Sequence, residues 1–240
     1  MSRAAPHLGP GPTTSERNHP PSPAERGVRV RTEEVELDAD FTPPAPRCGT
    51  VIFAHGSGSG RRSPRNRQVA RALNDRGLGT LLLDLLTEAE ARADEATAEY
   101  RFDIPLLTRR LLSATDWLLE EPQAARSPVG YFGASTGGAV AMRAAARLPH
   151  VIRAIVLRGA RSDLGDEVAS QIRCATLIVV GGLDPGIRVL NEHTMQRLSC
   201  PKSLVVVPGA SHLFEEKGTL EAVAKLAGDW FARYLVPTVP

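Results

Sequence analysis

Three residues in the second half of the chain have the side chains needed for nucleophilic catalysis. Ser135 lies within Gly-Ala-Ser-Thr-Gly, Asp184 follows the apolar run LIVVGG, and His212 follows the apolar run LVVVPG. A serine hydroxyl is a poor nucleophile until a base takes its proton, and imidazole titrates near neutral pH. A carboxylate behind the imidazole fixes its tautomer and stabilises the transient imidazolium. These residue types predict a triad with Ser135 as nucleophile, His212 as base and Asp184 as the orienting carboxylate.

The segment around Ser135 has the pattern of a strand, a sharp turn and a helix. Residues 129–132 are largely apolar, GASTG follows, and small residues then continue with helical character. Gly133 and Gly137 flank the serine, as expected where a strand and a helix close on each other. By itself this pattern is ambiguous, because Gly-x-Ser-x-Gly also occurs by chance in loops rich in glycine and serine. The order Ser, Asp, His, with each residue after its own predicted strand, favours the catalytic interpretation.

A second glycine-rich turn, HGSGSG, begins at His55 directly after the apolar run TVIFA. Serine enzymes with this order stabilise the substrate oxyanion with one N–H after the nucleophile and one from the loop after an earlier strand. We therefore predict an oxyanion hole formed by the N–H of Thr136 and that of Gly56 or Ser57. A phosphate-binding loop is the competing interpretation, but the spacing matches neither GxGxxG nor a loop ending in Gly-Lys-Ser/Thr. We interpret His55 as a structural loop residue, because no second nucleophile accompanies it.

Strands and helices alternate from residue 50 to the end of the chain. Apolar runs predict strands at 50–54, 80–86, 129–132, 152–157, 176–180 and 204–207, and helical spacing predicts helices at 65–76, 103–119, 136–146, 164–172, 190–198 and 220–235. This alternation predicts an α/β fold with a mostly parallel sheet, helices on both faces and ligands at the carboxyl ends of the strands. Val28 to Leu37 predicts a half-exposed edge strand. The acidic segment Glu88 to Glu99 predicts a loop or an exposed helical turn.

Four segments, HGSGSG, GASTGG, GGLDPG and PGASHLFEE, resemble the dienelactone hydrolase-like branch of the α/β-hydrolase superfamily. The resemblance extends over roughly residues 48 to 235 and implies the α/β-hydrolase fold. That branch typically uses a cysteine nucleophile, whereas this chain has Ser135 in the corresponding turn. The resemblance therefore implies serine-dependent hydrolysis of an ester or a related acyl substrate.

The spacing after the nucleophile helix leaves too little chain for a cap domain. Many α/β-hydrolases insert such a domain after the strand that follows this helix, but only about a dozen residues, Ser162 to Arg173, precede the next strand. We expect a site open to solvent, and a small or surface-bound ester as substrate in preference to a long-chain lipid. Glu88 to Glu99 is the only stretch long enough to fold partly over this site.

Arginines near the predicted site bear on the charge of the substrate. Four arginines closely follow the HGSGSG turn at residues 55–60, which we call the oxyanion loop: Arg61, Arg62, Arg65 and Arg67. Arg158 ends the strand after the nucleophile helix. A guanidinium group binds carboxylates and phosphates in a bidentate manner. Arg61 and Arg158 are therefore candidate substrate-binding residues, with a solvated loop and helix face as the alternative interpretation.

Composition excludes several classes of protein. The 240 residues suffice for one large α/β domain, placed at 28–240, after a disordered or loosely attached leader at 1–27 that is rich in Pro, Gly and Ser. The net charge is +2, from 29 basic and 27 acidic residues spread along the chain, which argues against nucleic acid as a partner. No run of about 18 apolar residues and no signal-peptide core occur, so no membrane association is expected. Three cysteines without metal-ligand spacing favour a reduced, cytoplasmic setting.

These features together predict a single-domain serine hydrolase that acts on a small-molecule ester or a related acyl substrate, with no cofactor and no metal ion. Two alternatives stay open. One is a non-catalytic scaffold of the same fold that binds a small ligand or a protein, although binding needs no triad. The other is acyl transfer to an acceptor other than water, which would use the same three residues.

Overall fold

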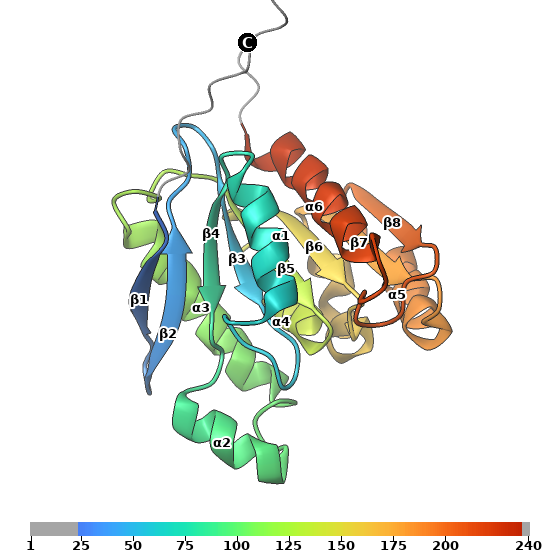
Figure 1. Ribbon diagram of the computed structural model, residues 1–240, viewed down its shortest axis with the longest axis horizontal. Helices are drawn as coiled ribbons and strands as arrows, with labels where there is room; N and C mark the ends of the chain where they lie inside the picture. Colours follow the sequence, from blue (N-terminus) through green and yellow to red (C-terminus); the bar gives the residue numbers. More distant parts are fainter. Residues whose placement is uncertain (1–23, 237–240) are drawn as a thin grey trace, which may run out of the picture.

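One sheet of eight strands runs through residues 24–236, the part of the chain that the computed structural model describes (Figure 1). The strands are β1 (Arg26–Arg31), β2 (Glu36–Thr42), β3 (Thr50–Ala54), β4 (Gly79–Leu83), β5 (Val129–Ala134), β6 (Ile152–Arg158), β7 (Ala175–Gly181) and β8 (Lys202–Val207). Their spatial order is β1-β2-β4-β3-β5-β6-β7-β8. β1 pairs with β2, and β2 with β4, in antiparallel fashion, and all other neighbours are parallel. The predicted mostly parallel sheet is confirmed.

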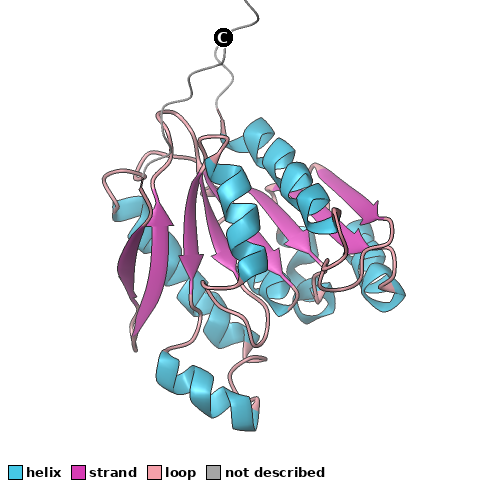
Figure 2. Ribbon diagram, in the orientation of Figure 1, coloured by secondary structure: helices cyan, strands magenta, loops and turns pink. Residues whose placement is uncertain are grey.

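Helices cover both faces of this sheet (Figure 2). They are α1 (Pro64–Asn74), α2 (Glu88–Thr97), α3 (Ile104–Glu120), α4 (Thr136–Arg147), the 3-10 helix η1 (Ser162–Gln171), α5 (Pro185–Arg197) and α6 (Thr219–Leu235). α1 and α6 pack side by side on one face, and α3 and α4 pack on the other (Figure 1). The described chain has only η1 between β6 and β7, so the expectation of an α/β-hydrolase fold without a cap domain is confirmed.

The hydrophobic core lies in two layers, one on each side of the sheet. Along β3, Ile52 belongs to the layer with α3 and α4, while Val51 and Phe53 belong to the layer with α1 and α6. Every residue of β3, β4, β5 and β7 is buried. Strands covered on both faces read as continuous apolar runs, which is why these runs were visible in the sequence. The carboxyl ends of these buried strands form a rigid edge on which side chains can be held in place.

The segment predicted as one edge strand, Val28 to Leu37, is a hairpin of two strands. A turn separates β1 from β2, and in it the Thr32 hydroxyl donates to the carbonyl of Val35 and accepts from the Val35 N–H. The pairing of Arg31 with Glu36 across the hairpin places the turn between them. β1 begins at Arg26, so the last two residues of the predicted leader belong to a strand. Residues 1–23 of that leader lie outside the described residues.

The acidic segment Glu88 to Glu99 forms helix α2 and not the loop that was predicted as one of two possibilities. Thr87 and Glu90 make a capping box, in which the Thr87 hydroxyl accepts from the Glu90 N–H and the Glu90 carboxylate accepts from the Thr87 N–H. Such a box satisfies two of the N–H groups that a helix start leaves unpaired. In Figure 1, α2 projects beyond the carboxyl ends of β3 and β4. It therefore lies next to the edge that carries the candidate site.

Candidate active site

Ser135 occupies the sharp turn between β5 and α4. Its backbone has φ 51° and ψ −120°, a strained conformation for a residue with a side chain. The Ser135 N–H donates to the carbonyl of Arg158 on β6 at 3.0 Å, which fixes the turn to the neighbouring strand. A Cβ on Gly133 would lie 2.6 Å from the carbonyl oxygen of Gly137. The close approach of strand and helix therefore requires glycine at that position, as predicted from the sequence.

His212 lies between Ser135 and Asp184, three residues separated widely in the sequence. Its Nε2 is 3.2 Å from Ser135 Oγ, and its Nδ1 is 2.6 Å from Asp184 Oδ2. Because a carboxylate only accepts, Nδ1 carries the proton and Nε2 is free to accept the serine proton. The His212 side chain is 36% exposed and that of Asp184 is 17% exposed, so the imidazole is accessible from solvent while the carboxylate is more sheltered. The structure brings the three predicted residues together in that order.

The loop that carries His212 is held by residues that the sequence reasoning did not single out. The N–H of Ser211 donates to the Glu216 carboxylate at 3.0 Å, and these hydrogen bonds hold the pKa of Glu216 below its ordinary value. Phe214, which has φ 57° and is fully buried, anchors the same loop in the core. Both residues lie in the PGASHLFEE segment. The Phe and Glu after the histidine were therefore the sequence signal that could have identified the residues supporting this loop.

The two halves of the predicted oxyanion hole are in direct contact. The N–H of Ser57 donates to the Thr136 hydroxyl at 3.0 Å, and the two hydroxyl oxygens are 3.1 Å apart. A Cβ on Gly56 would lie 3.0 Å from the Ala134 carbonyl oxygen, so the loop passes directly against the turn at Ser135. Thr136 is the first residue of α4, where the partial positive charge of the helix N-terminus favours an anion.

His55 is fully buried and connects the oxyanion loop to the end of β4. Its Nδ1 lies 2.9 Å from the carbonyl oxygen of Gly56, and its Nε2 accepts from the N–H of Leu85 at 2.9 Å. With a carbonyl on one ring nitrogen and an N–H on the other, the ring is held neutral, and burial lowers the pKa of His55. The contacts fit the structural role that the sequence analysis assigned to this histidine.

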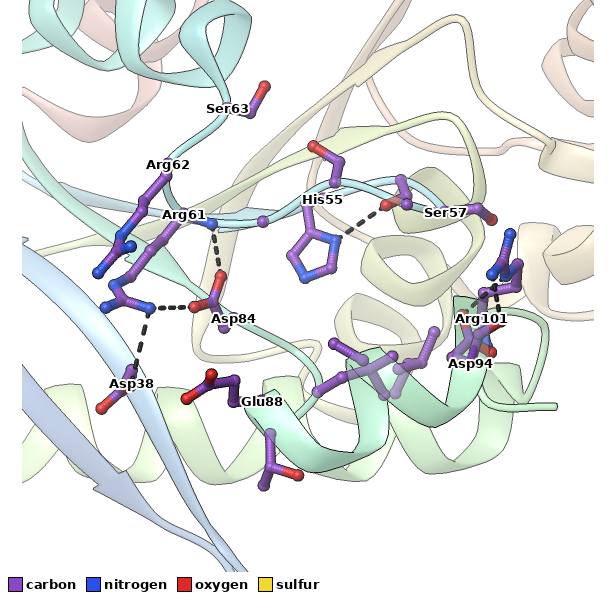
Figure 3. Close-up of a pocket in the computed structure, with 18 of the residues that line it drawn as sticks. Asp38, His55, Ser57, Arg61, Arg62, Ser63, Asp84, Glu88, Asp94 and Arg101 are labelled. Carbon is purple, nitrogen blue, oxygen red and sulfur yellow. Dashed lines mark hydrogen bonds and ion pairs between the residues drawn. The ribbon is translucent and has the colours of Figure 1, made fainter. Parts of the chain in front are cut away.

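A cleft of about 490 Å³ opens beside the oxyanion loop. Its wall includes Ser57 and Thr136 on the loop side and residues of α2 on the other, as expected for a segment that folds partly over the site. Figure 3 shows Arg61, Asp84 and Asp38 on one side of His55, and Arg101 with Asp94 on the other. The cleft is therefore highly polar, and it adjoins the nucleophile turn through Thr136.

The two arginines proposed as substrate ligands have different environments. Arg61 lines the cleft, and its guanidinium pairs with Asp84 and lies within 4 Å of Asp38 and Asp40. Arg158 is 7% exposed, stacks over the Phe214 ring at 5.6 Å and approaches the Leu213 carbonyl at 3.5 Å.

Burial and the nearby charge of Arg65 lower the pKa of Arg158 to about 10, so it stays charged at neutral pH. Neither arginine offers a substrate anion an unobstructed guanidinium. Their role as substrate ligands stays a prediction.

The cysteines do not resemble catalytic nucleophiles. Burial raises the pKa of Cys174 to about 12 and also raises that of Cys48, and a thiol attacks only as the thiolate. Cys48, Cys174 and Cys200 are all free thiols. Within residues 24–236, no three His, Cys, Asp or Glu side chains are grouped to hold a metal ion. None of the helices in that range has the length and apolar character needed to span a bilayer.

A serine at a strained strand-to-helix turn, with Asp and His after later strands of a mostly parallel sheet, defines the α/β-hydrolase class of proteins. The model of the Dienelactone hydrolase family matches residues 41–235. The chain belongs to this family.

Proteins of known structure or curated sequence resemble the chain over most of its length. A structure described as dienelactone hydrolase from Anabaena variabilis is 49% identical, with a TM-score of 0.87 over 89% of this chain and 99% of that one. Est1E from Butyrivibrio proteoclasticus has a TM-score of 0.73 at 16% identity, over 86% of this chain and 98% of that one. At this identity the similarity supports a shared fold and nothing further.

A curated relative carries a different kind of name. The putative phosphoribosyl transferase Rv0571c of Mycobacterium tuberculosis is 48% identical over 208 residues, which is 87% of this chain. The chain spans 46% of that relative's length. The relative's name describes the whole protein, of which this chain matches less than half.

Proposed function

We propose that the chain is a serine hydrolase that cleaves a small ester or a related acyl compound through an acyl-enzyme. The observation that carries this proposal is the position of His212, 3.2 Å from Ser135 Oγ and 2.6 Å from Asp184 Oδ2, at a strained turn. The substrate is a small molecule, and the triad itself needs no cofactor. Membership of a hydrolase family supports the class of reaction.

The geometry supports a two-step mechanism. Ser135 Oγ attacks the acyl carbon while its proton moves to His212 Nε2, and the carbonyl oxygen becomes an oxyanion. The oxyanion receives hydrogen bonds from the N–H of Thr136 and from that of Gly56 or Ser57. In the second case the Ser57 N–H exchanges its bond to the Thr136 hydroxyl for one to the oxyanion. When the bond to the leaving group breaks, His212 Nε2 returns the proton to the leaving oxygen.

Water then releases the acyl group by the same steps. His212 Nε2 takes a proton from water as the water oxygen attacks the acyl carbon. The bond from the acyl carbon to Ser135 Oγ then breaks, and His212 Nε2 returns the proton to Ser135 Oγ. Asp184 stays ionised throughout and stabilises the imidazolium through Nδ1. The acid and the alcohol are the products, and the protein regains its starting state.

The dienelactone branch typically uses a cysteine nucleophile, whereas this chain has Ser135. This difference determines which reaction we propose for the chain. We propose ester hydrolysis and not dienelactone cleavage, because the buried, high-pKa Cys174 cannot substitute as nucleophile. Transfer of the acyl group to another acceptor uses the same residues and is separated from hydrolysis by product analysis with and without an added alcohol. We further propose a cytoplasmic location, in keeping with three free thiols.

Covalent labelling tests the assignment of Ser135. A fluorophosphonate should modify Ser135 in the wild type and in Ser113→Ala, a control that removes an α3 serine bonded to the Arg109 carbonyl. Ser135→Ala should stay unlabelled and lose roughly 10⁴-fold or more in kcat on a simple acetyl ester, with an unchanged urea midpoint. A wild type that carries no label on Ser135, or a Ser135→Ala variant that keeps its turnover, would refute the proposal.

A further inference from the structure

The cleft beside the oxyanion loop lies on one particular side of the nucleophile. Its described lining includes Ser57 and Thr136 but neither Asp184 nor His212. In the mechanism above, the leaving oxygen must reach His212 Nε2 to receive a proton. The leaving group therefore occupies the His212 side, and the rest of the acyl group extends in the other direction, toward the cleft.

The wall of this cleft is dominated by charge. Six carboxylates and four guanidinium groups of the described chain line it, whereas Leu86, Ala91 and Leu107 are the apolar side chains larger than glycine in the same lining. An alkyl chain placed here would displace water from charged groups and return little apolar contact, which is unfavourable. The excess of two carboxylates also opposes an acyl group that carries negative charge.

Two pairs among these charged groups are held in place by close contacts. Arg61 pairs with Asp84, and the Arg101 Nε donates to Asp94 at 2.7 Å. Asp94 also accepts from the backbone N–H of Tyr100 and of Arg101, and although burial acts to raise its pKa, these hydrogen bonds hold it below the ordinary value. Paired groups still have free lone pairs and N–H groups at their edges. A hydroxyl both donates and accepts, so it matches such a surface without adding charge.

Helix α2 forms the outer wall and is itself fixed to the domain. Arg110 of α3 donates to both oxygens of Glu90, at 2.8 and 2.6 Å, and to the Leu85 carbonyl at 2.8 Å. Ala91, the residue after Glu90, lines the cleft with a methyl group. A preformed wall with a small residue facing the space leaves room for a ring-sized group.

We propose that this cleft holds the acyl group of the substrate and that this acyl group is hydroxylated and uncharged. The proposal rests on the serine hydrolase function proposed above, and it assigns the acyl side and the alcohol side of the ester to opposite sides of Ser135. Preference for a particular acyl group then comes from α2 and the oxyanion loop. The alcohol side faces the exposed part of His212 and is weakly selected.

Matched esters test both parts of this inference. The methyl ester of cyclohexanecarboxylic acid and that of its trihydroxylated analogue differ only in hydroxyl groups on the acyl ring, and cyclohexyl acetate carries the same ring on the alcohol side. We expect a kcat/KM at least about tenfold higher for the hydroxylated methyl ester than for the plain one. Equal or reversed values would overturn the inferred polarity.

Two tryptophan variants of α2 test the orientation. Ala91→Trp fills the cleft, and Ala93→Trp is the matched control, because Ala93 is also exposed on α2 but does not line the cleft. We expect Ala91→Trp to lower kcat/KM for the hydroxylated methyl ester at least about tenfold. The same variant should keep kcat/KM for cyclohexyl acetate within about twofold of the wild type. Ala93→Trp should change neither value.

The outcomes separate this inference from the proposed function. Loss confined to cyclohexyl acetate in Ala91→Trp, or equal loss for both esters, would overturn the assignment of the cleft to the acyl group. An unchanged Ala91→Trp variant would do the same. If the wild type hydrolyses none of the esters and takes no fluorophosphonate on Ser135, the hydrolase function itself fails, and the inference fails with it.

Discussion

The carboxyl edge of the sheet has two ends that are built in different ways. At one end, Ser135, Asp184 and His212 follow parallel strands, and two hydrogen bonds connect them in a row. At the other end, the cleft wall is α2, a helix outside the sheet that is connected by side-chain ion pairs such as Arg110 with Glu90. The residues that we propose to react therefore follow strands of the sheet, whereas the proposed substrate wall is a helix attached outside the sheet.

The two ends also differ in how charge is handled. In the proposed triad the Asp184 carboxylate faces the His212 imidazole, and the proposed mechanism depends on which ring nitrogen carries the proton. The cleft end contains several full ion pairs, and Arg110 within it is only 3% exposed. A buried charge is strongly destabilised when its partner is removed. A mutation in the triad should therefore change catalysis, and one at the base of α2 should change stability.

The largest expected effect comes from Asp184→Asn. The amide would donate to His212 Nδ1 and leave the proton on Nε2, so that Nε2 no longer accepts from Ser135. We expect kcat to fall about 10³- to 10⁴-fold, with the free energy of unfolding within about 0.5 kcal/mol of the wild type. Asp163→Asn, at a surface pair with Arg161, is the control and should keep full activity. A kcat within tenfold of the wild type in Asp184→Asn would contradict the expectation that mutations in the triad change catalysis.

Glu90→Gln tests the other end. Removing this carboxylate leaves the Arg110 guanidinium buried without a charged partner, which should cost about 3 kcal/mol of unfolding free energy. The control is Glu88→Gln, which removes an exposed i,i+4 pair with Arg92 and should cost less than about 0.5 kcal/mol. Urea denaturation measures both, and hydrogen exchange reports whether α2 opens first. Equal costs in the two variants would contradict the view that α2 depends on this pair.

The smallest effect is expected at His55, which connects the two ends. Burial lowers the pKa of His55 below its ordinary value of 6.5, so the unfolded chain binds this proton more readily than the folded one. The resulting stability is fully present above pH 6.5 and is lost as the pH falls through the lower, folded-state pKa. His55→Asn should cost about 1 to 3 kcal/mol at pH 8.

The pH dependence distinguishes this effect from a simple loss of packing. Urea midpoints measured from pH 8 to pH 5 should fall more steeply in the wild type than in His55→Asn, because the variant lacks the titrating ring. His150→Asn is the control, because it replaces an exposed histidine in the turn after α4. Parallel curves for the wild type and His55→Asn would show that folding does not lower the pKa of His55, and would contradict the prediction.

Local patterns made the triad and its strands predictable. The turn glycines around Ser135 and the apolar runs before Asp184 and His212 each lie in one short stretch of the sequence. Each stretch predicts its own secondary structure. The length of Ser162 to Arg173 was enough to exclude a cap. The Thr87 to Glu90 capping signal is also present in the sequence, although composition predicts only a loop or an exposed helical turn for this segment.

The sharp turn at Ser135, the order of the three candidate catalytic residues and the alternation of strands and helices could all be predicted from the sequence, because they depend on neighbours along the chain. Only the tertiary structure decided that His55 contacts Leu85, that Arg61 pairs with Asp84 and that α2 closes a cleft beside Thr136. These contacts follow from β4 lying beside β3, a strand order that no local pattern encodes. The positions of the candidate catalytic residues could therefore be predicted from the sequence, whereas the charged groups of the cleft come together only through tertiary packing.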